Sequence, residues 1–170
     1  MSTTARQAAE VLEDPVAQDL LHSPLHARLA YNGSDGFPRV VPVAYVWRNS
    51  QFVFCTPPNA PKTRALRRDP RVALTVDRDS VPPKLLLVRG TASVDVVEGI
   101  PPEYLEASRK TVSEDQWTAF EAQVRGLYNQ MARITIRPTW AKVLDFETRM
   151  PQAIEELGRA QPWRVSQEGT

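Results

Sequence analysis

The residues best suited to chemistry are Lys62, Thr63 and Arg64, which stand together in the basic stretch PKTRALRR at 61–68. If this stretch is helical, both cations fall in its first turn, where the helix dipole disfavours positive charge and favours anions. Free backbone N–H groups, a hydroxyl and two cations in one place are suited to hold an external anion such as a phosphate. The alternative interpretation is a basic helix that faces solvent and tolerates a small dipole penalty.

The elements that would position these residues are a β-hairpin and the turn that follows it. Arg39–Trp47 reads RVVPVAYVW and predicts a strand, because it is nearly all apolar and rich in β-branched and aromatic residues. The polar residues 48–50 predict a turn, and Gln51–Thr56 predicts the return strand. Pro57-Pro58 ends that strand, since proline cannot donate to the ladder. Asn59 is then a suitable N-cap for the basic helix.

The composition describes an ordinary soluble globular chain. Its 170 residues predict one domain that buries about two-thirds of its unfolded surface. Hydrophobic residues make up 42% and charged residues 24%. The 21 Lys and Arg against 20 Asp and Glu leave a net charge of +1, which gives no general attraction for nucleic acid or membrane. Any recognition of an anion must therefore be local.

The sequence predicts a cytoplasmic protein without a membrane segment. Its longest apolar runs fall short of the ~20 residues that a membrane span needs, and the N-terminal stretch lacks the apolar core of a signal peptide. The single cysteine, Cys55, cannot form an intramolecular disulfide, and no Cys/His cluster predicts a zinc site. Cys55 ends the apolar run FVFC, which favours a buried, inert thiol over a nucleophile.

No motif assigns a catalytic residue. The seven glycines form neither GxGxxG nor a P-loop, and Gly-x-Ser-x-Gly is absent as well. His22 and His26 flank Pro24 without a carboxylate partner at metal-binding spacing, so we interpret them as surface residues. No Asp/His pair and no pair of carboxylates presents itself as a general acid.

The remaining elements alternate strands with short helices. The expected helices are Thr4–Glu13, a further turn from Pro15 to Leu21, Glu103–Lys110, a helix that follows the capping box at 113–116, and Pro151–Leu157. The expected strands besides the hairpin are Leu25–Tyr31, Arg71–Asp77, Lys84–Val97, Arg133–Arg137 and Trp140–Phe146, with Pro138 separating the last two. Gly90, in the middle of the longest strand, predicts a bulge of the kind that curves a sheet into a barrel.

This pattern predicts a mainly β fold with helical insertions: six or seven antiparallel strands in a small closed or split β-barrel. We expect an N-terminal helical segment at 1–24, a barrel at 25–147 with a helical insertion at 101–130, and a C-terminal helix and tail at 148–170. Neither an internal repeat nor a linker interrupts the chain.

In the order of its segments the chain resembles the pyridoxamine 5'-phosphate oxidase-like split-barrel proteins, a superfamily of flavin- and deazaflavin-dependent oxidoreductases. The matching segments are RVVPVAYVW, a return strand ending FVFCT, PKTRALRRDPRVAL, a long strand with VRGTA, and RITIRPTWAKVLDF. The resemblance covers the chain from Ala27 to Phe146. Its most specific part is K-x-R-x-L-x-x-D-P-R-V followed by V-R-G-x-A. It implies the FMN-binding type of split barrel.

The resemblance also implies a homodimer with two cofactor sites in the dimer groove. A flavin or deazaflavin would lie along the barrel, with its phosphate at the basic helix. Carried over by position, the residues along the ring system are Val41, Pro42 and Val43, and those near the ribityl phosphate are Thr56, Lys62, Thr63 and Arg64. Pro42 fits this placement because a ladder without its N–H leaves room for a ligand edge; the less favoured alternative is an edge strand.

The C-terminal residues depart from this family. True pyridoxamine phosphate oxidases carry a substrate-binding segment with Arg and His there, whereas GRAQPWRVSQEGT contains no His. We therefore do not expect a typical pyridoxamine phosphate oxidase. Family members without that segment include reductases that use the deazaflavin coenzyme F420, and the Arg-, Ala- and Pro-rich composition looks actinobacterial, where that coenzyme is used. The resemblance thus slightly favours F420 over FMN.

The leading hypothesis is an oxidoreductase that transfers a hydride from F420 or FMN to a small apolar or conjugated acceptor, without a metal. The cofactor would supply the chemistry, and the protein would supply grip, orientation and exclusion of water. Tyr45, Trp47 and Trp140 are candidates for the walls of the acceptor pocket, or else core residues. The alternative function is a non-catalytic protein of the same fold that binds or sequesters a cofactor or haem. A third reading is a structural dimer with an empty groove.

Overall fold

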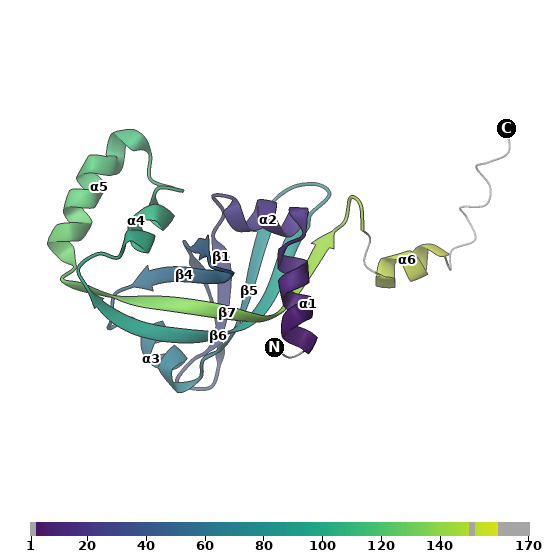
Figure 1. Cartoon of the computed structure of the whole chain (residues 1–170), viewed down its shortest axis with the longest axis horizontal. Helices are drawn as coiled ribbons and strands as arrows, with labels where there is room; N and C mark the ends of the chain where they lie inside the picture. The colour runs from purple at the N-terminus through teal and green to yellow at the C-terminus, as the bar shows by residue number, and fades with distance from the viewer. Residues whose placement is uncertain (1–2, 150–151, 160–170) are drawn as a thin grey trace.

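The computed structural model describes residues 3–149 and 152–159. Its main element is one antiparallel sheet (Figure 1). In this part of the chain the sheet has seven strands: β1 (Ala27–Asn32), β2 (Pro38–Val43), β3 (Val46–Arg48), β4 (Gln51–Thr56), β5 (Arg71–Arg78), β6 (Lys84–Glu98) and β7 (Gln130–Asp145). Their order across the sheet is β2-β1-β5-β6-β7-β4-β3, so β2 and β3 are the two edges and the barrel stays open between them. The predicted split barrel is confirmed.

Short helices decorate this sheet. They are α1 (Thr3–Leu12), α2 (Pro15–His22), α3 (Pro61–Arg68), α4 (Pro102–Ser108), α5 (Glu114–Leu127) and α6 (Gln152–Arg159). Helices α4 and α5 stand at one end of the sheet and α1 at the other (Figure 1). Among the described residues, no helix combines the length and apolar character that crossing a membrane requires. The end of the predicted C-terminal tail, 160–170, lies outside the described residues.

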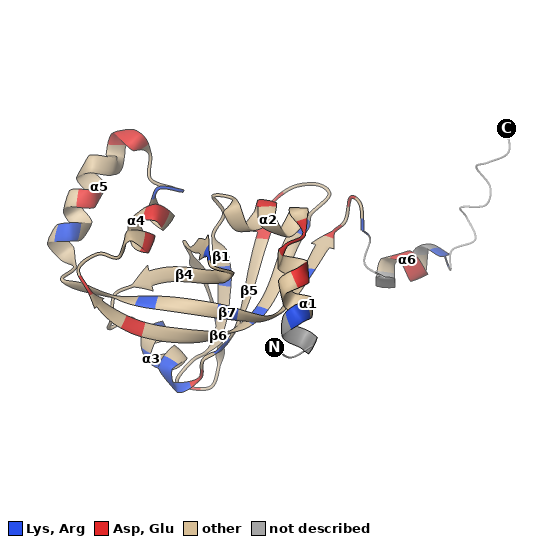
Figure 2. Cartoon of the chain, viewed as in Figure 1, with Lys and Arg blue, Asp and Glu red and all other residues tan. Residues whose placement is uncertain are grey.

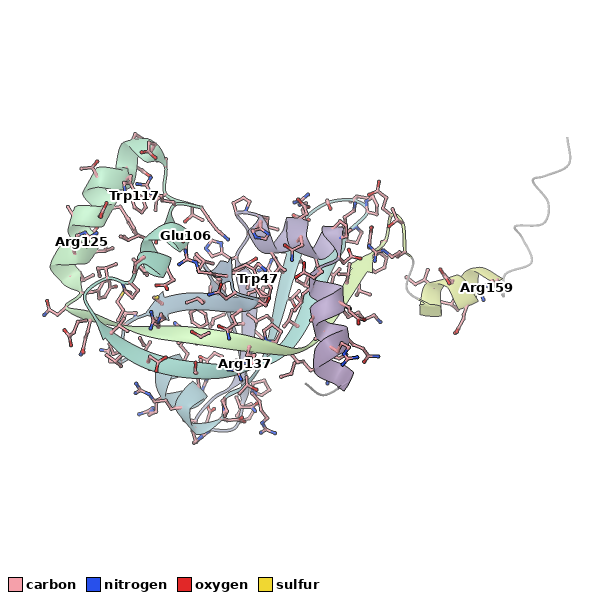
Figure 3. The ribbon with its side chains drawn as sticks, in the orientation of Figure 1. Trp47, Glu106, Trp117, Arg125, Arg137 and Arg159 are labelled. Atoms are coloured by element: carbon pink, nitrogen blue, oxygen red, sulfur yellow. The ribbon has the colours of Figure 1, made fainter. Side chains whose placement is uncertain are left out.

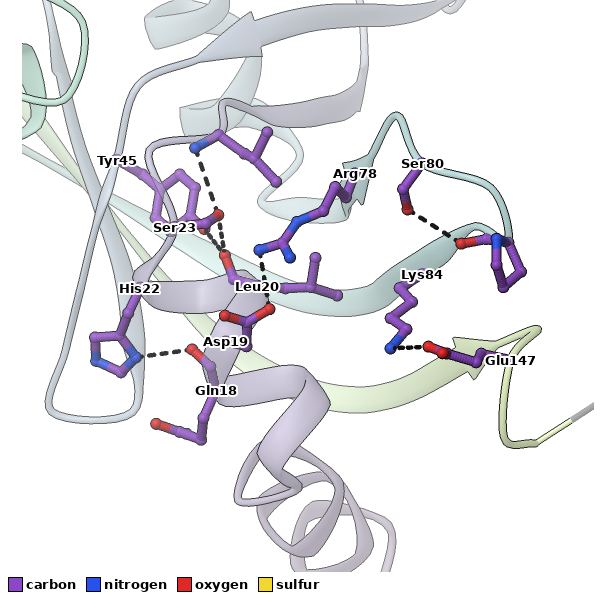
Figure 4. Close-up of polar contacts among 12 residues, drawn as sticks. Gln18, Asp19, Leu20, His22, Ser23, Tyr45, Arg78, Ser80, Lys84 and Glu147 are labelled. Carbon is purple, nitrogen blue, oxygen red and sulfur yellow. Dashed lines mark hydrogen bonds and ion pairs between the residues drawn. The ribbon is translucent and has the colours of Figure 1, made fainter.

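The predicted strand Arg39–Trp47 is divided in two, at Ala44 and Tyr45. Strand β2 pairs with β1, whereas β3 pairs with β4, so the chain leaves one edge of the sheet and joins the other at this point. Tyr45 is fully buried at the crossing, and its hydroxyl donates to the carbonyl oxygens of Leu20 at 3.2 Å (Figure 4) and of Leu21 at 3.1 Å. The sequence pattern did not show this crossing because both halves are equally apolar.

The two longest strands, β6 and β7, pair along their whole length, from Lys84↔Asp145 to Glu98↔Gln130. Their register shifts between Arg89 and Gly90, which confirms the predicted bulge. A Cβ atom at Gly90 would lie 2.6 Å from the carbonyl oxygen of Arg137, a contact that only glycine avoids.

The prediction of two separate strands on either side of Pro138 is wrong, because β7 is continuous. Gly90 pairs with Pro138 and Arg89 pairs with Trp140, so Thr139 is the extra residue of the bulge. The bulge removes a local stretch of the ladder from regular pairing, and the strand therefore tolerates a proline there.

The core lies on the inner face of the curved sheet. Its fully buried side chains include Leu29, Phe52, Leu86, Ile134 and Ile136, each from a different strand or from alternate positions of one. Helices α1 and α2 cover this core through Leu12, Leu20 and Leu21. Burial of such alternating apolar faces supplies most of the stabilisation of a sheet of this kind.

The N-cap of helix α2 forms an ion pair with Arg149, which follows the last strand. The Asp14 carboxylate accepts from the backbone N–H of Val16 at 2.9 Å and so caps α2. The same carboxylate binds the Arg149 guanidinium through two bonds of 2.6 and 3.0 Å. The Arg149 contact, as the first cause, holds the pKa of Asp14 below its usual range.

Candidate cofactor site

A pocket of about 160 Å³ lies where β2, β4, α3 and α4 meet. Its lining residues are Pro42, Val43 and Ala44 at the end of β2, Phe54 and Cys55 of β4, Lys62 of α3, and Tyr104, Ala107 and Ser108 of α4. Three residues predicted to hold a cofactor, Pro42, Val43 and Lys62, are thus brought together. The other four predicted residues do not line this pocket.

Lys62 is the cation of this pocket. Its side chain is half-buried, and among the described residues none forms an ion pair or hydrogen bond with its ammonium group. Burial lowers the pKa of Lys62, because desolvation disfavours its charged form. A partly desolvated cation without a counter-ion is suited to bind an anion that comes from outside the chain.

The start of α3 differs in detail from the prediction. The N-cap is Ala60 and not Asn59, no side chain caps the helix, and its first turn carries no acidic residue. The basic character of the helix is visible in Figure 2. Since nothing within the described chain neutralises this end of the helix, its dipole adds to the field of Lys62.

Thr63 and Arg64 face away from the pocket. The Thr63 side chain is fully buried, and its hydroxyl donates to the Pro57 carbonyl oxygen at 3.5 Å, while its backbone N–H donates to Ala60. Arg64 is exposed on the outer side of α3. Thr56 is buried, and Val41 packs partly against the core. These four residues, which were predicted to bind the cofactor, therefore do not line the pocket.

Sequence reasoning missed the contribution of α4. Ala107 and Ser108 come three and four residues after Tyr104, so all three fall on one face of a helix. That spacing was readable, but nothing in it indicated that α4 would lie against Lys62. The Ser108 hydroxyl donates to the Tyr104 carbonyl oxygen at 2.8 Å. Among the described residues, none hydrogen-bonds to the Tyr104 hydroxyl.

The other polar groups of the pocket are neutral near pH 7. Burial raises the pKa of Tyr104, so its phenol keeps its proton and is a donor. Burial, followed by the nearby Glu103 carboxylate, raises the pKa of Cys55 to about 12. The predicted inert thiol agrees with this environment. Lys62 is therefore the only formal charge among the residues that line the pocket.

The three aromatic residues proposed as walls of an acceptor pocket do not line this one. Tyr45 is in the core, the alternative left open by the sequence. Trp47 packs edge-on against Phe52, with ring centroids 4.9 Å apart, and Arg89 lies 4.3 Å above the ring of Trp140. Figure 3 labels Trp47, which belongs to the edge strand β3. No group of His, Cys, Asp or Glu in the described chain could hold a metal.

A second, wider hollow adjoins the pocket across the end of β2. It measures about 540 Å³ and shares Pro42 and Ala44 with the pocket. Its far side is formed by residues that include His26, Arg28 and Asp77. Arg28 Nε lies 3.0 Å from the Asp77 carboxylate, so this wall is polar but internally paired. Pocket and hollow therefore meet at the end of β2, and together we call them the depression.

Comparison with known proteins places this depression in context. The sequence model of the pyridoxamine 5'-phosphate oxidase family matches residues 13–132. No curated protein sequence matches the chain. A solved structure named F420 reductase is 25% identical with a TM-score of 0.51, covering 74% of this chain and 94% of that one.

Two further solved structures show the same fold at lower identity. A conserved hypothetical protein from Mycobacterium tuberculosis is 21% identical with a TM-score of 0.58, covering 78% of this chain and 84% of that one. The haem storage protein HutZ from Vibrio cholerae is 17% identical with a TM-score of 0.52, covering 74% of this chain and 89% of that one. These likenesses concern the fold alone.

Proposed function

The chain belongs to the pyridoxamine 5'-phosphate oxidase family, and from this premise we propose that it is an oxidoreductase that binds F420 or FMN in the depression along β2. The observation that carries the proposal is Lys62, a half-buried cation without a partner among the described residues, at the wall of a pocket. Both cofactors carry a phosphate on a ribityl-type chain, and this group fits an unpaired cation of that kind.

The residues of this chain would hold such a cofactor by its two ends. Lys62 would bind the phosphate in the pocket. The end of β2 would lie beside the ring system in the wider hollow, where Pro42 presents no N–H to the ligand. Phe54, Val43 and Ala107 give the pocket apolar walls that limit the access of water. When bound, the cofactor supplies a hydride, and a proton from solvent completes the reduction of the acceptor.

Of the two cofactors we favour F420. The likeness to an F420 reductase at 25% identity, spanning nearly all of that protein, supports this choice. The acceptor is proposed to be a small apolar or conjugated molecule, because the hollow beyond Pro42 is wide enough for a second small ligand beside a ring.

We also propose that the protein acts as a homodimer, with a second copy covering the open edge at β2. Val40, in this strand, is 64% exposed, and Phe37, just before it, is 73% exposed. Large apolar side chains exposed together at a sheet edge are commonly covered by a partner. Light scattering during gel filtration tests this directly: twice the chain mass supports the proposal, and the mass of one chain opposes it.

The experiment that tests the function has two stages. Purified protein is first titrated with F420 and, separately, with FMN, following the fluorescence of each. The reduced form of whichever cofactor binds is then mixed with quinones and α,β-unsaturated ketones in a stopped-flow instrument. Accelerated oxidation of the bound cofactor by an acceptor supports an oxidoreductase. Tight binding without acceleration by any acceptor would instead indicate a carrier or storage protein.

A further inference from the structure

We infer that Tyr104 is a ligand-binding residue, whose hydroxyl donates to the same phosphate that Lys62 binds. This inference rests on the proposed function and assigns a binding role to the helical insertion, which none of the family comparisons provides. It follows from the size of the pocket, from the distribution of donors and acceptors around it, and from the way the Tyr104 ring is held.

The size of the pocket indicates which part of a cofactor it takes. Pockets that enclose a whole ligand of cofactor size measure roughly 300–1,000 Å³. At about 160 Å³ this one is too small for a ring system with its chain, whereas the adjoining hollow of about 540 Å³ is large enough. A phosphate at the end of a polyhydroxyl chain suits the smaller space, with the chain passing over Pro42 and Ala44 into the larger.

The polar side chains of the pocket are donors. Lys62 offers an ammonium group and Tyr104 a protonated hydroxyl, and among the described residues neither has a partner. In a pocket of about 160 Å³, a phosphate that binds Lys62 also comes within reach of Tyr104. An anion with several acceptor oxygens satisfies both at once, whereas a cation or a lone donor satisfies neither.

No carboxylate among the described residues lines the pocket to compete for these donors. The two carboxylates of α4 next to Tyr104 both have a cation of the sheet nearby. The Glu106 side chain bonds to Arg48 on β3, and Glu103 lies 3.8 Å from the Arg133 guanidinium of β7. Glu106 is thus paired away from the pocket, whereas Glu103 does not line it but lies close enough to raise the pKa of Cys55.

The ring of Tyr104 is held by other aromatic residues. It stacks on Phe120 of α5 with ring centroids 6.3 Å apart and planes 12° apart, and it contacts Tyr128 edge-on at 6.5 Å. These contacts fix the direction of the phenol before a ligand arrives, so little conformational entropy is lost on binding. In this arrangement α5 serves as the support of a binding residue.

The test compares ligands with and without the phosphate, and FMN and riboflavin are the pair that differ in that group alone. Wild-type protein, Tyr104→Phe and the control Tyr128→Phe are titrated with FMN and riboflavin, and with F420 and its phosphate-free deazaflavin chromophore. Tyr104→Phe keeps the ring contacts and removes the hydroxyl. We expect this variant to bind the phosphorylated ligand about tenfold more weakly and the phosphate-free ligand with less than twofold change. Tyr128→Phe, which does not line the pocket, should change neither.

Three results would overturn the inference. If Tyr104→Phe weakens both ligands of a pair equally, the hydroxyl contacts the ring or chain and not the phosphate. If it weakens neither, Tyr104 does not contact the ligand. If wild-type protein binds none of the four ligands, the proposed function itself fails. Far-UV circular dichroism and a thermal melt of each variant confirm that the fold is intact before affinities are compared.

Discussion

Lys62 of α3 and Tyr104 of α4 line one pocket and face it with donors that have no partner in the described chain. Folding leaves the Lys62 cation half-buried, which is unfavourable in the free protein, and leaves the Tyr104 hydroxyl without a partner among the described residues. An arrangement of this kind is typical of binding sites, where the ligand supplies what the chain lacks. The predictions below separate residues that hold the fold from residues that hold the ligand.

The first prediction concerns the stability of the ligand-free protein. Lys62→Met keeps the apolar stem of the side chain and removes the charge that burial disfavours, so we expect the melting temperature to rise by about 1–3 °C. Because the pKa of Lys62 is lowered, the unfolded chain binds more protons between the folded pKa and the usual 10.5. The difference between variant and wild type should therefore shrink as the pH approaches 10.5. A melting temperature below that of wild type would contradict this account.

The second prediction concerns Tyr45. Because its hydroxyl donates to the Leu20 and Leu21 carbonyl oxygens inside the core, Tyr45→Phe should lower the free energy of unfolding by about 1 kcal/mol. Urea denaturation measures this loss. The variant should bind F420 or FMN as wild type does, since Tyr45 does not line the pocket. A tenfold weaker affinity of the variant for F420 or FMN would contradict this and indicate that Tyr45 contributes to the ligand site.

The third prediction concerns the bulge that bends β6 across β7. In Gly90→Ala the new methyl group would lie 2.6 Å from the Arg137 carbonyl oxygen and 2.8 Å from Ile136 Cγ2, so the two long strands must separate locally. We expect the free energy of unfolding to fall by about 1–3 kcal/mol. Gly126→Ala in α5 is the matched control, because a Cβ atom added there would have no neighbouring atom within 4 Å. It should raise stability by about 0.5 kcal/mol.

The fourth prediction concerns the ion pair between Asp14 and Arg149. Asp14→Asn keeps an oxygen that can cap α2 and removes the negative charge, so it should cost no more than about 1 kcal/mol at pH 7. The pKa of Asp14 is lowered, chiefly by Arg149, so the contribution of the pair is full above the usual pKa of 3.8 and is lost as the pH falls through the folded pKa. Denaturation at pH 7 and at successive steps below pH 3.8 should show the difference between wild type and variant shrinking as Asp14 is protonated. A difference that persists at low pH would assign the loss to the cap.

Much of the fold was predictable because it depends on local patterns. The alternation of apolar residues predicted the strands, the prolines predicted where elements begin or end, and Gly90 predicted the bulge. The break at Ala44–Tyr45 was not predictable, since it depends on which edge each half joins, and both halves carry the same pattern. Pro138 misled for a similar reason, because its effect is absorbed by a bulge that Gly90 creates on the neighbouring strand.

The α3 side of the candidate site was predictable from the sequence, and the α4 side was not. Lys62 was found because a cation in the first turn of a helix conflicts with the dipole, which is a local signal. Thr63 was placed with it by sequence neighbourhood, yet the helix turns it into the core. Tyr104 was missed because α3 and α4 are far apart in the sequence and line the same pocket only in the fold, which no periodicity within either helix encodes.

The central claim is that Lys62 binds the phosphate of a flavin-type cofactor, and calorimetric titration of wild type and Lys62→Ala with F420 and FMN tests it most directly. The account predicts that wild type binds at least one of the two and that the variant loses about 2 kcal/mol of binding free energy, roughly a thirtyfold weaker affinity. Equal affinity of wild type and variant would show that the cofactor lies elsewhere.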